Sequence, residues 1–565
     1  MYRRLYFLAE TNKWIPNSQT AYRQNHTTVD PLIALTTDIL EGFSKRQSTV
    51  FLSIDFSKAF DRVNNQLMLY RLHKLGLRGR MLSWIAEFLS DRQYRVVAPT
   101  KTEYVKFENG TPQGSSLSAL LFILYTASLL KSLDKLSLQH MNSALNNSGY
   151  ADDVATWTTD KDASVCTARL NDAIKVIQQW RDKWRLPISA EKTHFTLFTR
   201  RRIKPSEIPE LVIDGKVIAH KANVRFLGVV LDPKLTWSAH IDQLVATCYK
   251  KLNALRSLLG TFWKHHRKAL VTFYKAFIRP NLEYASEVWG SAAKTHLRKL
   301  DTVQATALRY ITGAFHTTSL LVLESDTMCS SLADRRKLHL ATSLNRICTL
   351  PDNSPLRIRL PLLNKVMKKS HFFTLAAHAH ESLFQQPHAG RSPERLPLQR
   401  PWQDDFCLPS KPHKTFKQEA RTKLREQQNS RYKNHQHGEH YRLFRPQISN
   451  TEFMSDLHNY ALSKVLLRLR SGHSKLAAHN KTIEDRKCRC GAEETIEHVL
   501  LHCDISRAVS KQRENFIESL RPYIAFGKLP QIKQLLMPSP RHTLMRQREL
   551  FKKVTQFALK LPHQI

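Results

Sequence analysis

The chain has 565 residues, 42% of them hydrophobic, and a formal net charge of +39. This hydrophobic content excludes a chain that is disordered throughout, and the length suggests roughly three or four domains. The charge favours a polyanionic partner such as a nucleic acid over a small-molecule substrate. A merely solvated basic surface remains an alternative.

Nothing in the sequence indicates a membrane-spanning or secreted protein. The longest apolar stretch, 118–130, is too short to span a bilayer, and the first ten residues lack the apolar core of a signal peptide. Five of the eight cysteines are scattered singly, which argues against a disulfide framework and for a reducing compartment. We therefore expect no membrane contact and a location in the nucleus, the cytoplasm or both.

Helical and extended patterns alternate along the first 235 residues, which predicts an α+β fold. Apolar residues at helical spacing predict helices at 28–43, 66–75, 80–89 and 118–130. Extended runs predict strands at 51–56, 94–97, 104–107, 194–198 and 226–231, and hairpins at 149–156 and 211–218.

The second half of the chain is expected to be mainly helical. The helical pattern runs from 238 to about 350 and returns at 454–467. Between them, 385–450 is rich in Pro, His, Gln and Arg and poor in apolar periodicity, which predicts a linker or a partly disordered connector. A basic amphipathic helix is expected at 544–561.

Three aspartates stand out because strand-like apolar segments carry them. Asp55 lies inside the run 51–56, and Asp152 and Asp153 lie at the turn of the predicted hairpin. A buried carboxylate is costly unless it is paired or holds a metal ion. If the two segments are neighbours, these carboxylates and the backbone carbonyl of Phe56 would form an oxygen-only pocket for two divalent cations. An isolated Asp-Asp pair is otherwise an ordinary turn.

Three sequence motifs that include these aspartates or lie between them resemble the motifs of a known family. They are Ile-Asp-Phe-Ser-Lys-Ala-Phe-Asp-Arg-Val at 54–63, Gly-Thr-Pro-Gln-Gly-Ser-Ser-Leu-Ser at 110–118 and Tyr-Ala-Asp-Asp at 150–153. In this order and spacing they resemble reverse transcriptases, in particular those of non-LTR (LINE-like) retrotransposons. The resemblance implies a right-hand polymerase fold with partial fingers, a palm and a helical thumb. It also implies an RNA-directed DNA polymerase that uses two Mg²⁺ ions to transfer dNTPs onto a DNA 3′ end.

The resemblance further implies roles for individual residues. Asp55 and Asp152 would be the principal magnesium ligands with Asp153 assisting, and Lys192 would lie near the nucleotide phosphates. Phe60 would lie under the sugar and select deoxynucleotides, and a structural role as a core aromatic is an equal alternative. For Lys192 the alternative is an exposed lysine without a function. The implied substrate-binding residues are Phe56, Phe60, Gln113 and Gly114, and the implied primer-binding residues are Phe226, Leu227 and Gly228.

A second constellation lies near the carboxyl terminus. Cys488, Cys490, His498 and Cys503 follow the pattern C-x-C-x7-H-x4-C, which offers four ligands for a closed tetrahedral zinc site. A short helix over 494–501 would turn His498 inward. His502 is an alternative ligand that spacing does not exclude, and chance cysteines beside a helical core are the other alternative. The cluster resembles the zinc knuckle of the same retrotransposon class, which fits RNA or DNA binding.

The resemblance also predicts the order of the domains and the partners. The expected domains are partial fingers and palm at 1–235, a helical thumb at 236–349, a connector at 350–453, a helix with the zinc knuckle at 454–530 and a basic helical tail at 531–565. The expected partners are an RNA template, a DNA primer or target and dNTPs. The matched region starts within the fingers, so we expect an amino-terminally truncated chain, and a catalytically inactive nucleic-acid-binding remnant is an alternative function. A DNA-templated repair or telomeric polymerase is a third.

Overall fold

The structure is a computed structural model. It describes residues 1–99, 101–139, 145–202, 208–259, 267–360, 372–384, 412–434, 439–445, 460–472, 476, 486–523, 530–537 and 542–563. The chain forms two compact units. The first comprises Met1–His240, Glu287–Ala292 and Leu340–Phe416, and the second comprises Ile241–Ser286, Ala293–His339 and Lys417–Ile565.

The first unit contains a five-stranded sheet with the strand order β4-β5-β1-β6-β9. The central strand β1 (Ser48–Ile54) pairs antiparallel with β5 (Asp153–Asp160) and β6 (His194–Phe198). The edge strands are β4 (Leu145–Tyr150), antiparallel to β5, and the short β9 (Ala219–His220), parallel to β6. Because Ile54 pairs with Val154, the residues that follow β1 and those that open β5 lie at the same end of the sheet.

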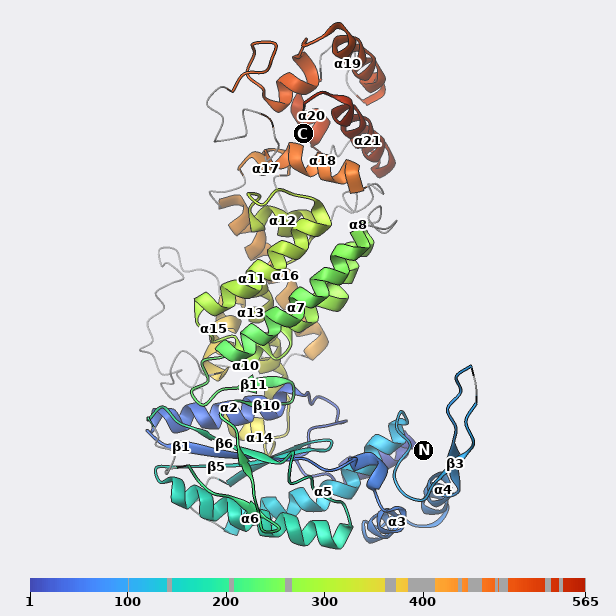
Figure 1. The fold of residues 1–565 in the computed structure, drawn as a ribbon, viewed down its shortest axis with the longest axis vertical. Helices are drawn as coiled ribbons and strands as arrows, with labels where there is room; N and C mark the ends of the chain where they lie inside the picture. Colours follow the sequence, from blue (N-terminus) through green and yellow to red (C-terminus); the bar gives the residue numbers. More distant parts are fainter. Residues whose placement is uncertain are drawn as a thin grey trace. The chain divides into compact units, whose positions relative to one another are not determined.

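Helices cover both faces of this sheet. The helices α5 (Ser116–Gln139) and α6 (Ala163–Trp184) lie on one face and α2 (Val29–Ser44) on the other (Figure 1). On β1, Val50 and Leu52 are fully buried in the core that includes α5 and α6. Phe51 is also fully buried and packs edge-on against Phe226. A strand buried on both faces explains why β1 reads as a continuous apolar run.

The helix α5 is longer than the sequence pattern predicted. Among the described residues it is the one helix that is long and apolar enough to cross a membrane, with a mean hydropathy of 1.6 over Ser116–Leu138. However, 72% of that apolar window is buried inside the protein, against the sheet and α6. The prediction of a buried core helix here is confirmed.

Two bidentate ion pairs fasten α2 to a segment more than 300 residues further along the chain. Arg346 pairs with Asp30 at 2.5 and 3.1 Å, and Arg359 pairs with Asp38 at 2.6 and 2.8 Å. Burial alone would raise the pKa of Asp30, but hydrogen bonds from His26 and Arg346 outweigh it and hold that pKa below its usual value. The described segment that follows residue 340 therefore completes the first unit.

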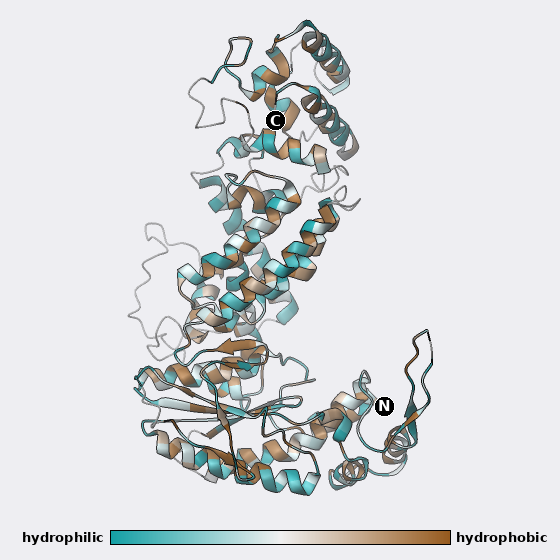
Figure 2. Ribbon diagram, viewed as in Figure 1, coloured by the Kyte–Doolittle hydropathy of each residue, from teal (hydrophilic) through white to brown (hydrophobic). Residues whose placement is uncertain are grey.

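The second unit is helical. Its helix α11 (Lys294–Thr312) packs against α8 (Arg267–Phe273) and α12 (Leu320–Thr327), and hydrophilic and hydrophobic residues alternate along it (Figure 2). A separate apolar core joins α18 (Tyr460–Ser471), α19 (Arg507–Leu520), α20 (Ile532–Leu536) and α21 (Leu544–Lys560).

The remaining elements, in chain order, are α1 (Tyr2–Thr11), η1 (Ala59–Arg62), α3 (Asn65–Lys74), α4 (Gly79–Leu89), β2 (Arg92–Tyr94), β3 (Val105–Phe107), β7 (Val212–Ile213), β8 (Lys216–Val217), β10 (Val224–Phe226), β11 (Val229–Leu231), α7 (Ser238–Leu259), η4 (Tyr274–Ile278), α9 (Arg279–Glu283), α10 (Ser286–Trp289), α13 (Leu332–Cys348), α14 (Pro355–Ile358), α15 (Phe372–Phe384), α16 (His413–Asn434), α17 (Glu439–Phe444), η8 (His498–His502) and η9 (Arg521–Tyr523).

The α+β class is confirmed, and most predicted elements are found within a few residues of their expected ends. Two predictions were wrong in detail. The run 226–231 is a hairpin of β10 and β11, because Leu227 and Gly228 both adopt positive φ and reverse the chain. The expected connector contains the helices α16 and α17. Other parts of the connector, at 361–371, 385–411, 435–438 and 446–453, lie outside the described residues, and the predicted domain boundaries stay a prediction.

Candidate active site

The three aspartates predicted from the sequence come together at one end of the sheet. Asp55 directly follows β1, Asp152 lies in the turn between β4 and β5, and Asp153 opens β5. Ala151 has φ +55 in this turn, the left-handed conformation that lets the chain reverse within two residues. The hairpin therefore presents its two carboxylates beside the end of the central strand.

These carboxylates are more exposed than the sequence suggested. Asp152 and Asp153 face solvent and Asp55 is half-buried, because all three lie just beyond the buried part of their strands. The expectation of buried carboxylates is thus wrong for Asp152 and Asp153, and the site also crowds like charges together.

The pKa values of the hairpin aspartates reflect this crowding. Loss of hydration and the charges of Asp152 and Asp55 raise the pKa of Asp153 to about 6. Loss of hydration and the Asp55 charge also raise the pKa of Asp152. The repulsion between neighbouring carboxylates adds to the effect of lost hydration. A cation bound between them would relieve that repulsion.

Asp55 offers a free oxygen to such a cation. Its Oδ2 is buried and accepts no hydrogen bond from the described residues, and Lys192 Nζ lies 3.9 Å from it. The backbone N–H of Ser189 donates to the Asp55 carbonyl, and that of Ser57 donates to Pro187. These bonds leave the carbonyl of Phe56, between Asp55 and Ser57, out of the pairing.

The donor set therefore fits hard divalent cations, which prefer carboxylate and carbonyl oxygens. The types of ligand atom suit such cations, but the three carboxylates are not close enough together to form a complete metal site. Among the described residues, the sets of three or more ligand atoms that lie within 4.8 Å of one another belong to Cys488, Cys490, Glu494, His498, Cys503 and His563, and the aspartates are not among them. Binding of a cation would have to draw the three carboxylates closer together.

Phe56 and Phe60 flank the aspartates on the core side. Phe56 is buried and contacts the ring of Trp180 edge-on, with 6.0 Å between ring centroids. Phe60 is half-buried and stacks on Phe122, with 4.3 Å between ring centroids. The second contact is what a core aromatic would make, and the half-exposed edge of Phe60 leaves room for contact with a ligand. Both sequence interpretations of Phe60 therefore stay open.

The loop at 110–114 lies against the short helix η1. Gln113 is exposed and donates a hydrogen bond of 2.9 Å to Asp61. Gly114 has φ +93, and a Cβ at this position would meet nothing within 4 Å, so the role of this glycine is conformational. Gly110 makes the close approach instead, because a Cβ there would lie 2.6 Å from the Asp61 carbonyl oxygen. Arg92 holds the same loop by donating to the Gly110 carbonyl.

The residues predicted to grip a primer form the tip of the β10–β11 hairpin. Phe226 is buried in the sheet core, whereas Leu227 is half-exposed and Gly228 is exposed. The structure thus gives the three residues different environments, and Leu227 and Gly228 are the two that a ligand can reach.

A buried glutamine that sequence reasoning missed supports the aspartate turn. The Oε1 of Gln19 accepts hydrogen bonds from the backbone N–H groups of Ala21, at 3.1 Å, and Ala151, at 3.3 Å. Thr20 and Ser18 pair with the backbone of Gly149, so the segment around Gln19 lies alongside the end of β4. Gln19 itself is completely buried.

The cysteine and histidine cluster predicted near the carboxyl terminus is also assembled, in the second unit. Ligand atoms of Cys488, Cys490, His498 and Cys503 all lie within 4.8 Å of one another, close enough to hold a metal ion. The Nε2 atom of His498 lies 3.1 Å from the Cys490 sulfur, and the Cys488 and Cys503 sulfurs lie 3.6 Å apart. His502 is exposed and outside the cluster, so the structure selects His498.

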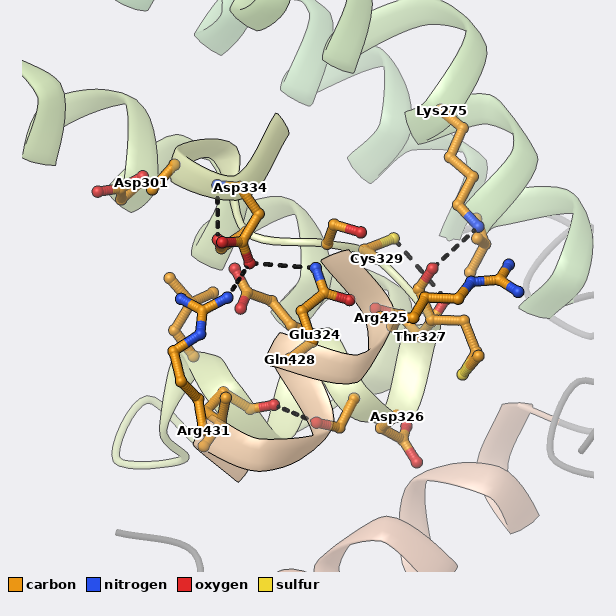
Figure 3. A pocket seen from close by; sticks show the side chains of 18 of the residues that line it. Lys275, Asp301, Glu324, Asp326, Thr327, Cys329, Asp334, Arg425, Gln428 and Arg431 are labelled. Atoms are coloured by element: carbon orange, nitrogen blue, oxygen red, sulfur yellow. Dashed lines mark hydrogen bonds and ion pairs between the residues drawn. The ribbon is translucent and has the colours of Figure 1, made fainter. Parts of the chain in front are cut away.

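A cavity of about 770 Å³ lies in the second unit, and none of the residues of either constellation lines it (Figure 3). Its wall carries acidic and basic side chains, several of which already pair with one another: Asp334 accepts from Gln428 and Arg431, and Arg267 pairs with Asp326. Several charges of the cavity are thus paired within it.

Glu324, in the wall of this cavity, gives a pH-dependent prediction. Its side chain accepts a hydrogen bond of 2.7 Å from the uncharged amide of Gln304, and burial raises its pKa to about 8. The folded protein therefore keeps a proton that the unfolded chain, with a carboxyl pKa of about 4.3, releases. Stability is lost as the pH rises between these two values.

We expect Glu324→Gln to stabilise the second unit at pH 8.5 by on the order of 2 kcal/mol, and to change its stability little near pH 5. Thermal unfolding followed by circular dichroism at both pH values checks this. The exposed Glu426→Gln on α16 is a matched control. A Glu324→Gln effect of equal size at both pH values would contradict the raised pKa.

The sheet, the carboxylate-bearing hairpin and the adjacent loops all fall within one stretch that matches a known family. A family model described as "Reverse transcriptase (RNA-dependent DNA polymerase)" matches residues 3–231. The chain therefore carries a reverse transcriptase domain, and the described part of that domain holds all three aspartates.

Its relatives are polymerases of mobile elements. The chain is 31% identical over 306 residues to the "RNA-directed DNA polymerase from mobile element jockey" of Drosophila funebris, which covers 54% of this chain and 33% of the relative. It is 29% identical over 333 residues to the jockey polymerase of Drosophila melanogaster, over 59% of this chain and 36% of the relative. The "Probable RNA-directed DNA polymerase from transposon BS" of the same species is 25% identical over 334 residues, which cover 59% of this chain and 36% of the relative.

The chain is thus homologous to the polymerases of non-LTR retrotransposons, and it matches about a third of the length of these curated relatives. A solved structure of apo telomerase from Candida tropicalis matches with a TM-score of 0.33 and 13% identity, over 66% of this chain and 60% of that chain. At that score the likeness supports no assignment.

Proposed function

We propose that this chain is an RNA-directed DNA polymerase that extends a DNA 3′ end with dNTPs on an RNA template. The observation that carries the proposal is the convergence of Asp55, Asp152 and Asp153 at one end of the sheet, within a reverse transcriptase domain. The net charge of +39 supports a nucleic-acid partner. Its RNA template, DNA primer and dNTPs are part of this proposal, as is a nuclear or cytoplasmic location.

The aspartates would hold two Mg²⁺ ions, which when bound lower the pKa of the attacking 3′ hydroxyl and neutralise charge on the phosphates. The Oδ2 atom of Asp55 is available for this because no described residue donates to it. Lys192 is exposed and its Nζ lies 3.9 Å from Asp55 Oδ2, where its ammonium group would meet the phosphates of an incoming nucleotide. Phosphoryl transfer needs little from the protein beyond such positioning and charge neutralisation.

The neighbouring residues would position the nucleotide and the primer. Phe60, fixed in orientation by its stack on Phe122, would contact the sugar, and Gln113 and Gly114 would contact the base pair. Leu227 and Gly228, at the accessible hairpin tip, would contact the primer, and the buried Phe226 would anchor that hairpin.

Primer extension tests the proposal. The purified chain, a labelled DNA primer annealed to an RNA template, dNTPs and Mg²⁺ should give products whose sequence follows the template. The same primer on a DNA template tests whether the enzyme prefers RNA. Salt-sensitive binding without any extension would reject the proposal in favour of an inactive nucleic-acid-binding protein.

Gln19 gives a prediction about positioning within the same site. Gln19→Leu removes the acceptor of the Ala151 N–H and should loosen the turn that carries Asp152. We expect extension to fall by about 10–100-fold, since small misplacements of reacting groups have effects of this size. The apparent KM for dNTPs and kcat would both be measured. Gln24→Leu, on the exposed part of the same segment, is the control, and equal activities of the two variants would contradict the role.

We also propose that Cys488, Cys490, His498 and Cys503 bind one structural Zn²⁺. Three sulfurs and one imidazole nitrogen are the ligands of a closed zinc site, and the four lie within 4.8 Å of one another. The metal content of the purified chain tests this, with an expected value of one zinc per chain. A small zinc module in a basic chain would assist RNA or DNA binding.

A further inference from the structure

The last described residue, His563, reaches the cysteine and histidine cluster from outside its sequence motif. Its Nε2 lies 3.5 Å from the sulfur of Cys503, and its Nδ1 lies 2.8 Å from a carboxylate oxygen of Glu494. The side chain of His563 is only 3% exposed. Ligand atoms of Cys488, Glu494 and His563 also lie within 4.8 Å of one another. Two residues besides the four proposed ligands therefore line the metal position.

Cys503 is the point where these contacts meet. Its backbone N–H donates to the carbonyl of His498 at 2.7 Å, and its own carbonyl accepts a hydrogen bond from the buried guanidinium of Arg513 on α19. Its sulfur lies between Cys488 and His563. The backbone of Cys503 is therefore fixed, and His563 is the outer neighbour of its sulfur.

The helix α21 delivers His563 to this position. Its apolar face packs into the same core as the cluster, and Phe557 stacks on Phe516 of α19 with 4.1 Å between ring centroids. Phe551 of α21 packs beneath the guanidinium of the fully buried Arg470. Because α21 is held by its apolar face, its end is brought to the cluster, and the contact of His563 adds to that packing.

We propose that His563 and Glu494 are positioning residues of the zinc site, and that zinc binding and docking of the carboxy-terminal end of α21 stabilise each other. The inference rests on the zinc site proposed above. The carboxylate of Glu494 lies 2.8 Å from Nδ1 and so orients the imidazole, and Nε2 contacts the Cys503 sulfur. Residues that hold a metal ligand from outside in this way typically change metal affinity by about 10–100-fold when they are replaced.

The test compares two histidine-to-glutamine variants of the full chain. His563→Gln removes the proposed positioning contact, and His502→Gln changes an exposed histidine beside Cys503 that is outside the cluster. Zinc affinity would be measured by competition with a chromogenic chelator. We expect a loss of about 10–100-fold for His563→Gln and none for His502→Gln. Equal affinities of the His563→Gln variant and the unchanged chain would overturn the proposal.

Two further readouts separate this role from others. The absorption spectrum of the Co²⁺-substituted chain reports the ligands, and we expect the three-sulfur, one-nitrogen spectrum in both variants. Loss of the nitrogen ligand in His563→Gln would make His563 a ligand and overturn the positioning role. Failure of the unchanged chain to bind zinc would instead reject the zinc site itself.

The coupling to α21 has its own readout, tryptic cleavage at the exposed Lys552 and Lys560. Removal of zinc from the unchanged chain should accelerate this cleavage, because coupling between two binding events is reciprocal. His563→Gln should be cleaved at the faster rate even with zinc present. Cleavage rates that do not depend on zinc would contradict the coupling.

Discussion

Replacement of Asp152 by asparagine should reduce primer extension on an RNA template by a factor on the order of 10³ or more. The carboxylate of Asp152 lies in the turn between β4 and β5, next to Asp153 and near enough to Asp55 to feel its charge. Asparagine fills the same space but carries no charge, so the site loses one of three carboxylates that would hold the divalent cations. Extension rates at saturating dNTP measure the effect.

The variant should remain folded, because Asp152 is exposed and its charge is repelled by its neighbours. The same amount of RNA–DNA duplex should bind to it. Asp182→Asn, an exposed aspartate on α6, is the matched control and should extend primers normally. Extension by Asp152→Asn at the rate of the unchanged chain would reject the assignment of this carboxylate, and loss of activity in both variants would point to an effect on folding.

The second large effect is expected at the zinc site. Cys503→Ser should abolish zinc binding, because it removes one of three thiolates and the sulfur that His563 contacts. Structural zinc sites contribute apparent free energies of about 10–16 kcal/mol in small zinc modules. We therefore expect the zinc content to fall from one per chain to none, and the described region around η8 and α19 to become sensitive to trypsin.

A free cysteine elsewhere provides the comparison for this variant. Cys348, on α13, lies outside the cluster, and Cys348→Ser should leave both the zinc content and the tryptic pattern unchanged. Full zinc content in Cys503→Ser would contradict the ligand assignment. A zinc-free but protease-resistant Cys503→Ser chain would show instead that the apolar core of α18–α21 is sufficient to hold the region.

The aspartate site could be located from sequence because its signal is local. Asp55 follows a run of apolar residues that only a buried central strand requires, and the two hairpin aspartates stand beside a turn. Their exposure could not be predicted in the same way. Strand ends are set by where pairing stops, and the last register pair, Ile54 with Val154, leaves the carboxylates just outside the core.

The residues that support the sites escaped prediction because their partners are distant in the chain. Gln19 accepts a hydrogen bond from the N–H of Ala151, which is 132 residues away in the chain. His563 contacts Cys503, which is 60 residues away. A glutamine or a histidine by itself carries no sign of burial. The helix α2 was a different case, because Leu32, Leu35 and Ile39 give it a helical period that is visible in the sequence.

The two ion pairs on α2 have a consequence for the order in which the protein acquires its structure. Asp30 and Asp38 pair with arginines that follow them by 316 and 321 residues. At synthesis rates of about 5–20 residues per second, the arginines emerge from the ribosome roughly 15–60 s after α2 does. Throughout that interval the nascent first unit carries both acids of α2 without their arginine partners. The first unit is thus finished late, by a segment that is synthesised after the helices of the second unit have begun to appear.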